Sequence, residues 1–234
     1  MHNPGRATAL RFAKAYPVVL LARKTESFQD TVSEINDAGG KALGIAADAA
    51  DPQSVRAAFD KIKAELPDHK LAAAIYNVAA GFVRKPFLEL SVEEFDASID
   101  GSARGFFNFA QATLPLLLDA VSNSEHAPTL IATGATASVR GSASFGSLAS
   151  GMFARRALSQ SLAREFGPQG VHVAHAIIDG IIDIPRTSAF SANGGVEDGK
   201  ISAHAIADSY WHLHSQPRSA FTQELDLRPF VEKF

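Results

Sequence analysis

The chain has 234 residues, of which 46% are hydrophobic and 20% charged, and its formal net charge is −3. This composition is typical of a globular protein, and a mild negative charge without any basic run argues against a nucleic-acid partner. The absence of cysteine excludes disulfides, thiol nucleophiles and cysteine-based metal sites. The longest apolar runs, such as PVVLLA and LPLLL, are too short to span a bilayer. We therefore expect one domain, residues 1–234, in the cytoplasm and without membrane contact.

Short apolar runs and longer amphipathic segments alternate along the chain. Strands are expected, in chain order, at 18–22, 41–47, 71–76, 129–133, 171–178 and 221–227. Helices are expected at 27–40, 51–66, 91–121, 147–166 and 203–214. Asp51 before Pro52, and Ser91 followed by Glu94, are N-terminal helix signals. The strict alternation predicts an α/β fold of three layers, with a doubly wound parallel sheet between two layers of helices.

Several segments occur in an order that is familiar from one protein family. They are GRATALRFAK, ADAADPQSV, AAIYNVAAG, FNFAQATLPLLL and RRALSQSLAREFGPQGVHVAHAIIDG. In this order they resemble the short-chain dehydrogenase/reductase family over nearly the whole chain. The resemblance implies a Rossmann-like fold, ancestry among NADP-dependent oxidoreductases, and a homodimer or homotetramer packed through the helices at 98–121 and 148–166.

The resemblance also implies four catalytic positions, which the family fills with Asn, Ser, Tyr and Lys. In this chain the four positions hold Ser102, Ala135, Leu148 and Met152. A shift of one residue would bring Thr136 near the Ser position. No shift supplies the proton donor, because residues 130–165 contain neither tyrosine nor lysine. We therefore expect that standard hydride transfer has been lost.

The cofactor side of the family pattern is only partly present. Of the glycine-rich turn that precedes the first helix, only the last glycine, Gly5, has a match, and the strand before that turn is absent. By resemblance, Arg23 and Lys24 after strand 18–22 suggest NADP, since no acidic residue is there to hold a ribose hydroxyl. Asp48 and Asn77 match residues that contact the cofactor in the family. We expect NADP binding to be weak or absent.

The absent strand would lie in the middle of the sheet, between strands 18–22 and 71–76. Its loss leaves backbone groups on two neighbouring strands without partners, which is costly when they are buried. The sequence leaves three solutions open: the two strands pair directly, a partner fills the space, or the sequence starts after the missing strand.

Two further functions remain open besides a degenerate oxidoreductase that retains a small-molecule ligand. The first is a non-redox enzyme, such as a lyase, isomerase or cyclase, with Tyr76 as proton donor and Asp179 as base, since both follow strands. The alternative for these residues is structural: Tyr76 fills space and Asp179 caps a turn. The second function is binding or assembly through the apolar face of helix 147–166, which includes Leu148, Met152 and Phe153. His172 and His175 alternate across a strand, so we expect no metal site.

Overall fold

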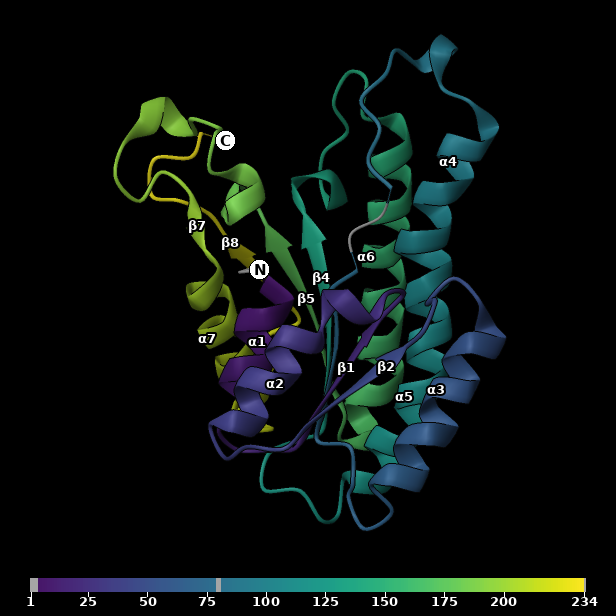
Figure 1. Ribbon diagram of the computed structural model, residues 1–234. Helices are drawn as coiled ribbons and strands as arrows, with labels where there is room; N and C mark the ends of the chain where they lie inside the picture. Colours follow the sequence, from purple (N-terminus) through teal and green to yellow (C-terminus); the bar gives the residue numbers. More distant parts are fainter. Residues whose placement is uncertain (1–3, 79–80, 234) are drawn as a thin grey trace.

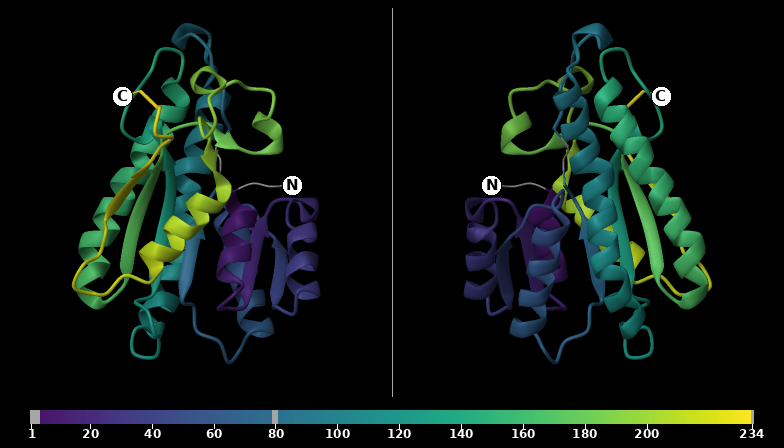
Figure 2. Two further views of the ribbon diagram at one scale, coloured as in Figure 1. Left: turned by 90° about the vertical axis from the view of Figure 1, so that its left-hand side faces the viewer. Right: turned by 90° about the vertical axis from the view of Figure 1, so that its right-hand side faces the viewer.

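Strands and helices alternate in the computed structural model, which describes residues 4–78 and 81–233 and forms three layers (Figures 1 and 2). The helices are α1 (Pro4–Phe12), α2 (Gln29–Asp37), α3 (Pro52–Glu65), α4 (Val92–Ile99), α5 (Gly105–Ala120), α6 (Gly146–Phe166) and α7 (Ala203–His214). The strands are β1 (Val18–Ala22), β2 (Ala42–Ala46), β3 (Ala73–Tyr76), β4 (Thr129–Ala135), β5 (His172–Ile178), β6 (Ile182–Asp183), β7 (Ile201–Ser202) and β8 (Glu224–Leu227). The predicted α/β fold with a parallel sheet is confirmed.

The parallel strands are divided into separate ladders. Four of them pair in the order β3–β4–β5–β8, while β1 pairs with β2 in a ladder of its own and β6 pairs with β7. No ladder joins β1 to β3 among the described residues. Direct pairing of these two strands, one of the three solutions left open by the sequence, is therefore wrong.

Two apolar cores lie on opposite faces of the strands. On one face, side chains of β3, β4 and β5 pack against α5 and α6 around Phe106, Leu117 and Leu130, none of which is exposed. On the other face, α1 and α7 cover Ile131 and the inner side of β5, with Ile206 and other buried side chains between them. The central strands β4 and β5 are thus buried on both faces, as their largely apolar sequences predict.

The helix expected at 91–121 is interrupted. Its first part, α4, begins with the predicted capping box of Ser91 and Glu94 and ends at Ile99. A π-helical turn, Asp100–Arg104, follows before α5 begins. Gly151 of α6 approaches this turn so closely that a Cβ atom added there would lie 2.8 Å from Cβ of Ser102. The prediction missed the break because close packing against another helix, and not local propensity, produces it.

The remaining predicted boundaries differ from the observed ones by a few residues. Asp51 caps α3 through a 2.9 Å bond from the Gln53 amide, as predicted. Between β6 and β7 the chain forms two short 3-10 turns, Pro185–Thr187 and Asn193–Gly195. No helix among residues 4–78 and 81–233 is both long and apolar enough to cross a membrane.

Candidate functional site

A cluster of polar side chains lies where β4, β5 and β8 end. The Thr136 hydroxyl, just after β4, donates to the carboxylate of Asp179, which follows β5. The other carboxylate oxygen of Asp179 lies 3.1 Å from a guanidinium nitrogen of Arg228, just after β8. Arg228 in turn binds both carboxylate oxygens of Asp226, at 2.6 and 3.1 Å. The carboxyl ends of parallel strands are where ligands bind in this fold class, so the cluster lies at the expected place for a site.

Arg155 lies beneath this end of the sheet and is 1% exposed. Its guanidinium donates to four backbone carbonyl oxygens, those of Val78, Gly101, Ser102 and Thr133, at 2.6 to 3.1 Å. It also lies over the ring of Tyr76, 4.8 Å from the centroid. Burial lowers the pKa of Arg155 to about 10, which still leaves the side chain charged at neutral pH. Arg155 therefore ties α6 to the π-helical turn and to the ends of β3 and β4.

All three tyrosine hydroxyls of the chain have partners away from the polar cluster. The Tyr76 hydroxyl donates to the Gly101 carbonyl at 2.8 Å, and burial raises its pKa to about 12. The Tyr210 hydroxyl lies 2.7 Å from that of Thr133, and burial raises its pKa as well. The Tyr16 hydroxyl bonds to His214 at the opposite end of the strands. None of these groups is placed to give a proton to a ligand beside Asp179.

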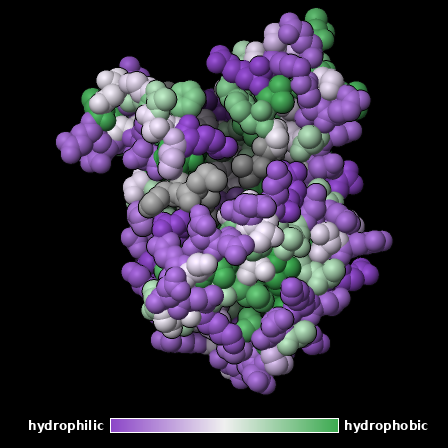
Figure 3. Space-filling view, in the orientation of Figure 1, coloured by the Kyte–Doolittle hydropathy of each residue, from purple (hydrophilic) through white to green (hydrophobic). Residues whose placement is uncertain are grey.

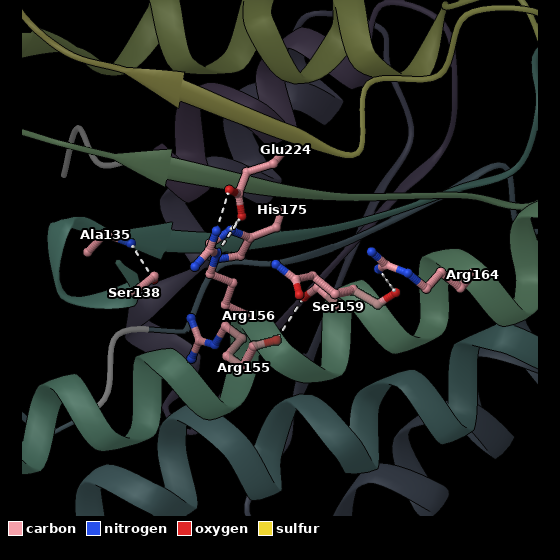
Figure 4. Close-up of polar contacts among 9 residues, drawn as sticks. Ala135, Ser138, Arg155, Arg156, Ser159, Arg164, His175 and Glu224 are labelled. Atoms are coloured by element: carbon pink, nitrogen blue, oxygen red, sulfur yellow. Dashed lines mark hydrogen bonds and ion pairs between the residues drawn. The ribbon is translucent and has the colours of Figure 1, made fainter. Parts of the chain in front are cut away.

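A second polar group joins α6 to the middle of β5 and the first residue of β8 (Figure 4). Arg156 binds the Glu224 carboxylate through two nitrogens, at 2.7 and 2.8 Å, and Nδ1 of His175 lies 3.1 Å from the same carboxylate. Hydrogen bonding from Arg156 lowers the pKa of Glu224, whereas burial lowers that of His175. His175 is 1% exposed, so this group braces the packing of α6 on the sheet and does not face a ligand.

Comparison with known proteins assigns the chain to a family. The family model described as "Enoyl-(Acyl carrier protein) reductase" matches residues 4–209. The chain belongs to the short-chain dehydrogenase/reductase family. A short-chain dehydrogenase from Rhodopseudomonas palustris has a similar structure, with a TM-score of 0.80, 32% identity, and coverage of 97% of this chain and 93% of that one.

Other relatives are more distant. A 1-cyclohexenylcarbonyl-CoA reductase from Streptomyces collinus is 27% identical over 76% of this chain, a stretch that spans 61% of that reductase. The short-chain reductase NovJ from Streptomyces niveus is 26% identical over 96% of this chain and 83% of its own length. A short-chain dehydrogenase from Burkholderia cenocepacia, solved with NADP, has a TM-score of 0.82 at 24% identity, covering 97% of this chain and 93% of that one. At this identity it shows the fold alone.

The positions at which the family holds its catalytic residues can now be located. Ser102 is fully buried in the π-helical turn, and Ala135 ends β4 with its amide donating to the Ser138 hydroxyl at 3.1 Å (Figure 4). Leu148 and Met152 lie one turn apart on α6, half-buried and buried respectively. Met152 thus belongs to the core face of the helix, which corrects the expectation that it shares the outer apolar face with Phe153.

The residues predicted to bind the cofactor lie on α1 and after β1, β2 and β3. Gly5 is in the first turn of α1. Arg23 and Lys24 are exposed after β1, and Asn77 is half-buried after β3. Asp48 forms a turn, its carboxylate accepting from the Ala50 amide at 3.0 Å. That bond indicates that Asp48 stabilises a turn, as aspartates after strands commonly do.

A cavity of about 660 Å³ adjoins the start of α1. Arg6, Ile184, Lys200, Ser202 and His204 are among its lining residues. The Lys200 ammonium already donates to the Thr187 carbonyl at 2.9 Å, and Arg6 pairs with Glu34. The exposed cations after β1 fit a 2′-phosphate, but Met152 offers no charge at the position where, by resemblance, the family's lysine holds the nicotinamide ribose. The residues present do not fit a productively bound NADP.

Apolar side chains rim the carboxyl end of the strands. Phe82, Phe87, Leu88 and Val92 are between 54% and 96% exposed, and Phe190 on the facing segment is 59% exposed. Figure 3 shows the molecule divided into two lobes at this end, with apolar surface on the lobe that carries α4. An exposed apolar rim of this kind is typical of a ligand-binding or interaction surface.

Sequence reasoning found some of the site and missed the rest. It selected Asp179 from its place after a strand, which is where the structure brings it together with Thr136. It missed Arg228, since nothing in the tail indicates an ion pair with a residue almost fifty positions earlier. It also missed Arg155. The pair of adjacent arginines in FARRALSQ was an available signal, because this helix is expected to pack on the sheet.

Proposed function

We propose that this chain is a short-chain dehydrogenase/reductase relative that binds a small-molecule ligand at the carboxyl ends of β4, β5 and β8 and no longer catalyses NADP-dependent hydride transfer. One observation carries the proposal. Leu148 and Met152 occupy the positions of the proton donor and its lysine, and the three tyrosine hydroxyls are all bonded elsewhere. A positioned general acid accelerates a reaction by ~10²–10⁴-fold. Helix α6 contains no tyrosine or lysine that could serve as this acid beside Asp179.

The test is a titration of the purified protein with NADPH and NADH, followed by calorimetry. We expect dissociation constants weaker than ~1 mM, equivalent to less than about 4 kcal/mol of binding free energy. The same samples, mixed with a panel of aldehydes and ketones, should show no loss of NADPH absorbance. Micromolar binding, or measurable NADPH oxidation, would overturn the proposal.

A variant with restored catalytic residues separates the effect of the catalytic side chains from the effect of the cofactor site. The triple change Leu148→Tyr, Met152→Lys and Ala135→Ser restores the family's residues at three catalytic positions. It should not restore reductase activity, because Ser102 still occupies the position of the family's Asn, and of the residues given only Gly5 matches the family's glycine-rich turn. Activity in this variant with any carbonyl substrate would show that only the catalytic side chains were missing.

Non-redox chemistry is a second candidate, favoured by the Thr136–Asp179–Arg228 cluster. Asp179 is held by a hydroxyl and a guanidinium at a place where ligands bind, and a carboxylate so placed is able to act as a base. Tyr76 is not proposed as the proton donor of this reaction, because its buried hydroxyl already donates to the Gly101 carbonyl.

This second candidate is tested by proton exchange. A panel of ketones and thioesters is incubated in heavy water, and exchange of the proton next to the carbonyl is followed by NMR. If Asp179 acts as a base, the protein accelerates exchange, Asp179→Asn abolishes the acceleration, and Asp226→Asn retains it. Asp226 is a matched control since it also binds Arg228 but is exposed. No exchange with any compound excludes this candidate.

A further inference from the structure

A small cavity lies between the start of α6 and the segment that leads into α4. Its volume is about 240 Å³. The lining includes Lys85, Phe87 and Leu90 before α4, and Ala143, Gly146 and Ser147 around the start of α6. Figure 1 shows α4 and α6 side by side on this lobe of the molecule. The Thr136–Asp179–Arg228 cluster contributes no residue to the lining, so the cavity is a separate site.

Helix α6 begins at this cavity without a cap. The residue before the helix is Phe145, whose side chain makes no capping hydrogen bond. Among residues 4–78 and 81–233, no oxygen accepts from the amides of Gly146, Ser147 and Leu148, and the first bonded amide is that of Ala149, 2.9 Å from the Phe145 carbonyl. An uncapped helix start carries partial positive charge. It therefore offers several donors to an anion.

Ser147 adds a buried donor to these amides. The side chain is 1% exposed, and its hydroxyl has no hydrogen-bond partner among the described residues. The Ser147 carbonyl, in contrast, accepts from the Ser98 hydroxyl at 3.0 Å. A buried hydroxyl without a partner is costly, and such groups are rare in folded proteins. Because Ser147 lines the cavity, an acceptor oxygen of a ligand there would satisfy its hydroxyl.

Lys85 brings a cation to the same cavity. Its ammonium lies 2.5 Å from the Glu94 carboxylate, which accepts one of the three N–H donors. Glu94 thus balances part of the charge and leaves further donors on Lys85. The Lys85 amide also donates to the Ser144 carbonyl at 3.1 Å, which joins the two lining segments. Ser144 has a φ of 67°, a conformation that is uncommon for residues other than glycine.

The remaining walls of the cavity are apolar. Phe87, Leu90 and Ala143 form them, and Phe87 is 78% exposed. A Cβ atom added at Gly146 would lie 3.6 Å from the Phe87 ring, so this ring is close to the start of α6. The volume is below the ~300–1,000 Å³ of sites for drug-sized ligands. The donors and the apolar wall are therefore within reach of one short molecule.

We propose that this cavity binds a short aliphatic monocarboxylate. The carboxylate accepts from the first amides of α6 and from the Ser147 hydroxyl, and the aliphatic chain packs on Phe87 and Leu90. A single negative charge suits the site because Lys85 already shares its charge with Glu94. The apolar walls would leave the further oxygens of a sulfate or phosphate without partners. The proposal does not depend on the loss of hydride transfer.

The test is an NMR titration of the isotope-labelled full chain with sodium butyrate. We expect saturable shifts of the Gly146, Ser147 and Leu148 amides, with a dissociation constant below about 50 mM. Butyramide has nearly the same shape but no charge, and it should bind about ten-fold more weakly because charged acceptors form stronger hydrogen bonds. Sulfate should also bind more weakly than butyrate.

Three results of this titration would overturn the proposal. They are a lack of saturation with butyrate, equal binding of butyrate and butyramide, and binding of sulfate as tight as that of butyrate. The last result would identify a general anion site without selection for an aliphatic chain.

Variants of the chain test the role of the buried hydroxyl. Ser147→Ala should weaken butyrate binding about ten-fold, since one hydrogen bond to the carboxylate is lost. It should not lower the stability to urea, because it removes a buried group that has no partner. Thr8→Ala is the matched control: the Thr8 hydroxyl on α1 is also buried without a partner among the described residues, but it does not line the cavity.

Butyrate binding should be unchanged in Thr8→Ala. Unchanged binding in Ser147→Ala, or an equal loss in both variants, would overturn the proposal. If Ser147→Ala fails to fold, the comparison of butyrate with butyramide decides the question on the unaltered chain.

Discussion

The main ladder, β3–β4–β5–β8, and the smaller β1–β2 ladder differ in how completely they are built. In the main ladder, β4 pairs with β5 over seven residues, and β5 is buried throughout. In the smaller one, β1 pairs with β2 alone and no residue of β1 is fully buried. The Thr136–Asp179–Arg228 cluster lies on the first, whereas all the residues expected to hold NADP except Asn77 lie on α1 or after β1 and β2. The part that would shape a ligand site is well supported, and the part that would hold the nucleotide is not.

The largest effect is expected from Arg155, which ties together the main ladder. Arg155→Met removes the charged donor that four backbone carbonyl oxygens share, although the Gly101 carbonyl keeps its bond from Tyr76. A buried acceptor that loses its donor costs roughly 1–3 kcal/mol, so two or three such losses amount to roughly 3–5 kcal/mol. We expect the free energy of unfolding, measured with urea, to fall by about this amount.

Arg156→Met is the matched control for that measurement. Arg156 is the next residue on α6, but its side chain is 29% exposed and its single partner is Glu224. An exposed ion pair contributes about 1 kcal/mol or less. Equal losses for the two variants would show that Arg155 is not the central tie of the main ladder.

The second effect concerns His214, which lies at the amino ends of the strands. The Thr129 hydroxyl donates to the Ala127 carbonyl and lies 3.0 Å from Nδ1 of His214, while the Tyr16 hydroxyl lies 2.9 Å from Nε2. Thr129 therefore accepts from Nδ1, and in the neutral ring Nε2 accepts from the Tyr16 hydroxyl. Burial, reinforced by the nearby His126 and His172, lowers the pKa of His214 to about 4.

Stability should consequently depend on pH between about 6.5 and 4. Below pH ~6.5 the unfolded chain binds a proton at His214 that the folded chain does not bind until about pH 4. Acidification through this window should therefore remove up to about 3 kcal/mol of stability. His214→Phe should flatten the pH dependence of urea unfolding, whereas the same change at the exposed His212 should not. An unchanged slope in His214→Phe would contradict the assignment.

The third effect compares the two ladders directly. Native-state hydrogen exchange at increasing urea should show the amides of Leu20 and Ile45 exchanging through a partial opening. Those of Ile131 and Ala174 should require global unfolding. We expect the opening free energy of the first pair to be lower by about 2 kcal/mol, since segments with less burial open first. An equal opening free energy for all four amides would show that the β1–β2 ladder is as stable as the main ladder.

The sequence predicted the fold because the information for it is local. Runs such as VVLLA and VHVAHAII indicate buried strands, and Asp51 with Pro52 marks the start of a helix. The break in the helix expected at 91–121 could not be predicted, since it depends on the approach of Gly151 and on carbonyls that bind Arg155.

The site was predictable only in part, for a related reason. The family resemblance placed Ser102, Ala135, Leu148 and Met152, and position after a strand selected Asp179. Pairing of Asp179 with Thr136 and Arg228 joins three strand ends that are far apart in the sequence. Which strand ends lie side by side depends on the order of the strands in the sheet. The alternation of strands and helices along the sequence does not determine that order.

The smallest effect on stability is expected from Phe153. This side chain on α6 is 42% exposed, and Phe107 and Leu116 on α5 are 49% and 37% exposed. Family resemblance implies that α5 and α6 pack against their counterparts in a second copy. We therefore expect a dimer or tetramer, with Phe153 in its interface.

Phe153→Glu separates association from folding. An exposed position tolerates substitution within about 0.5 kcal/mol, so the variant should unfold at nearly the same urea concentration at low protein concentration. A carboxylate buried at an interface has no partner there, so the variant should be monomeric. Light scattering across a dilution series measures the difference, and Phe190→Glu, exposed on the opposite lobe, is the control. A wild type that stays monomeric at high micromolar concentration would refute the assembly. It would leave the apolar surface of α5 and α6 without the partner that the family resemblance implies, and would direct attention to the rim around the strand ends as the interaction surface.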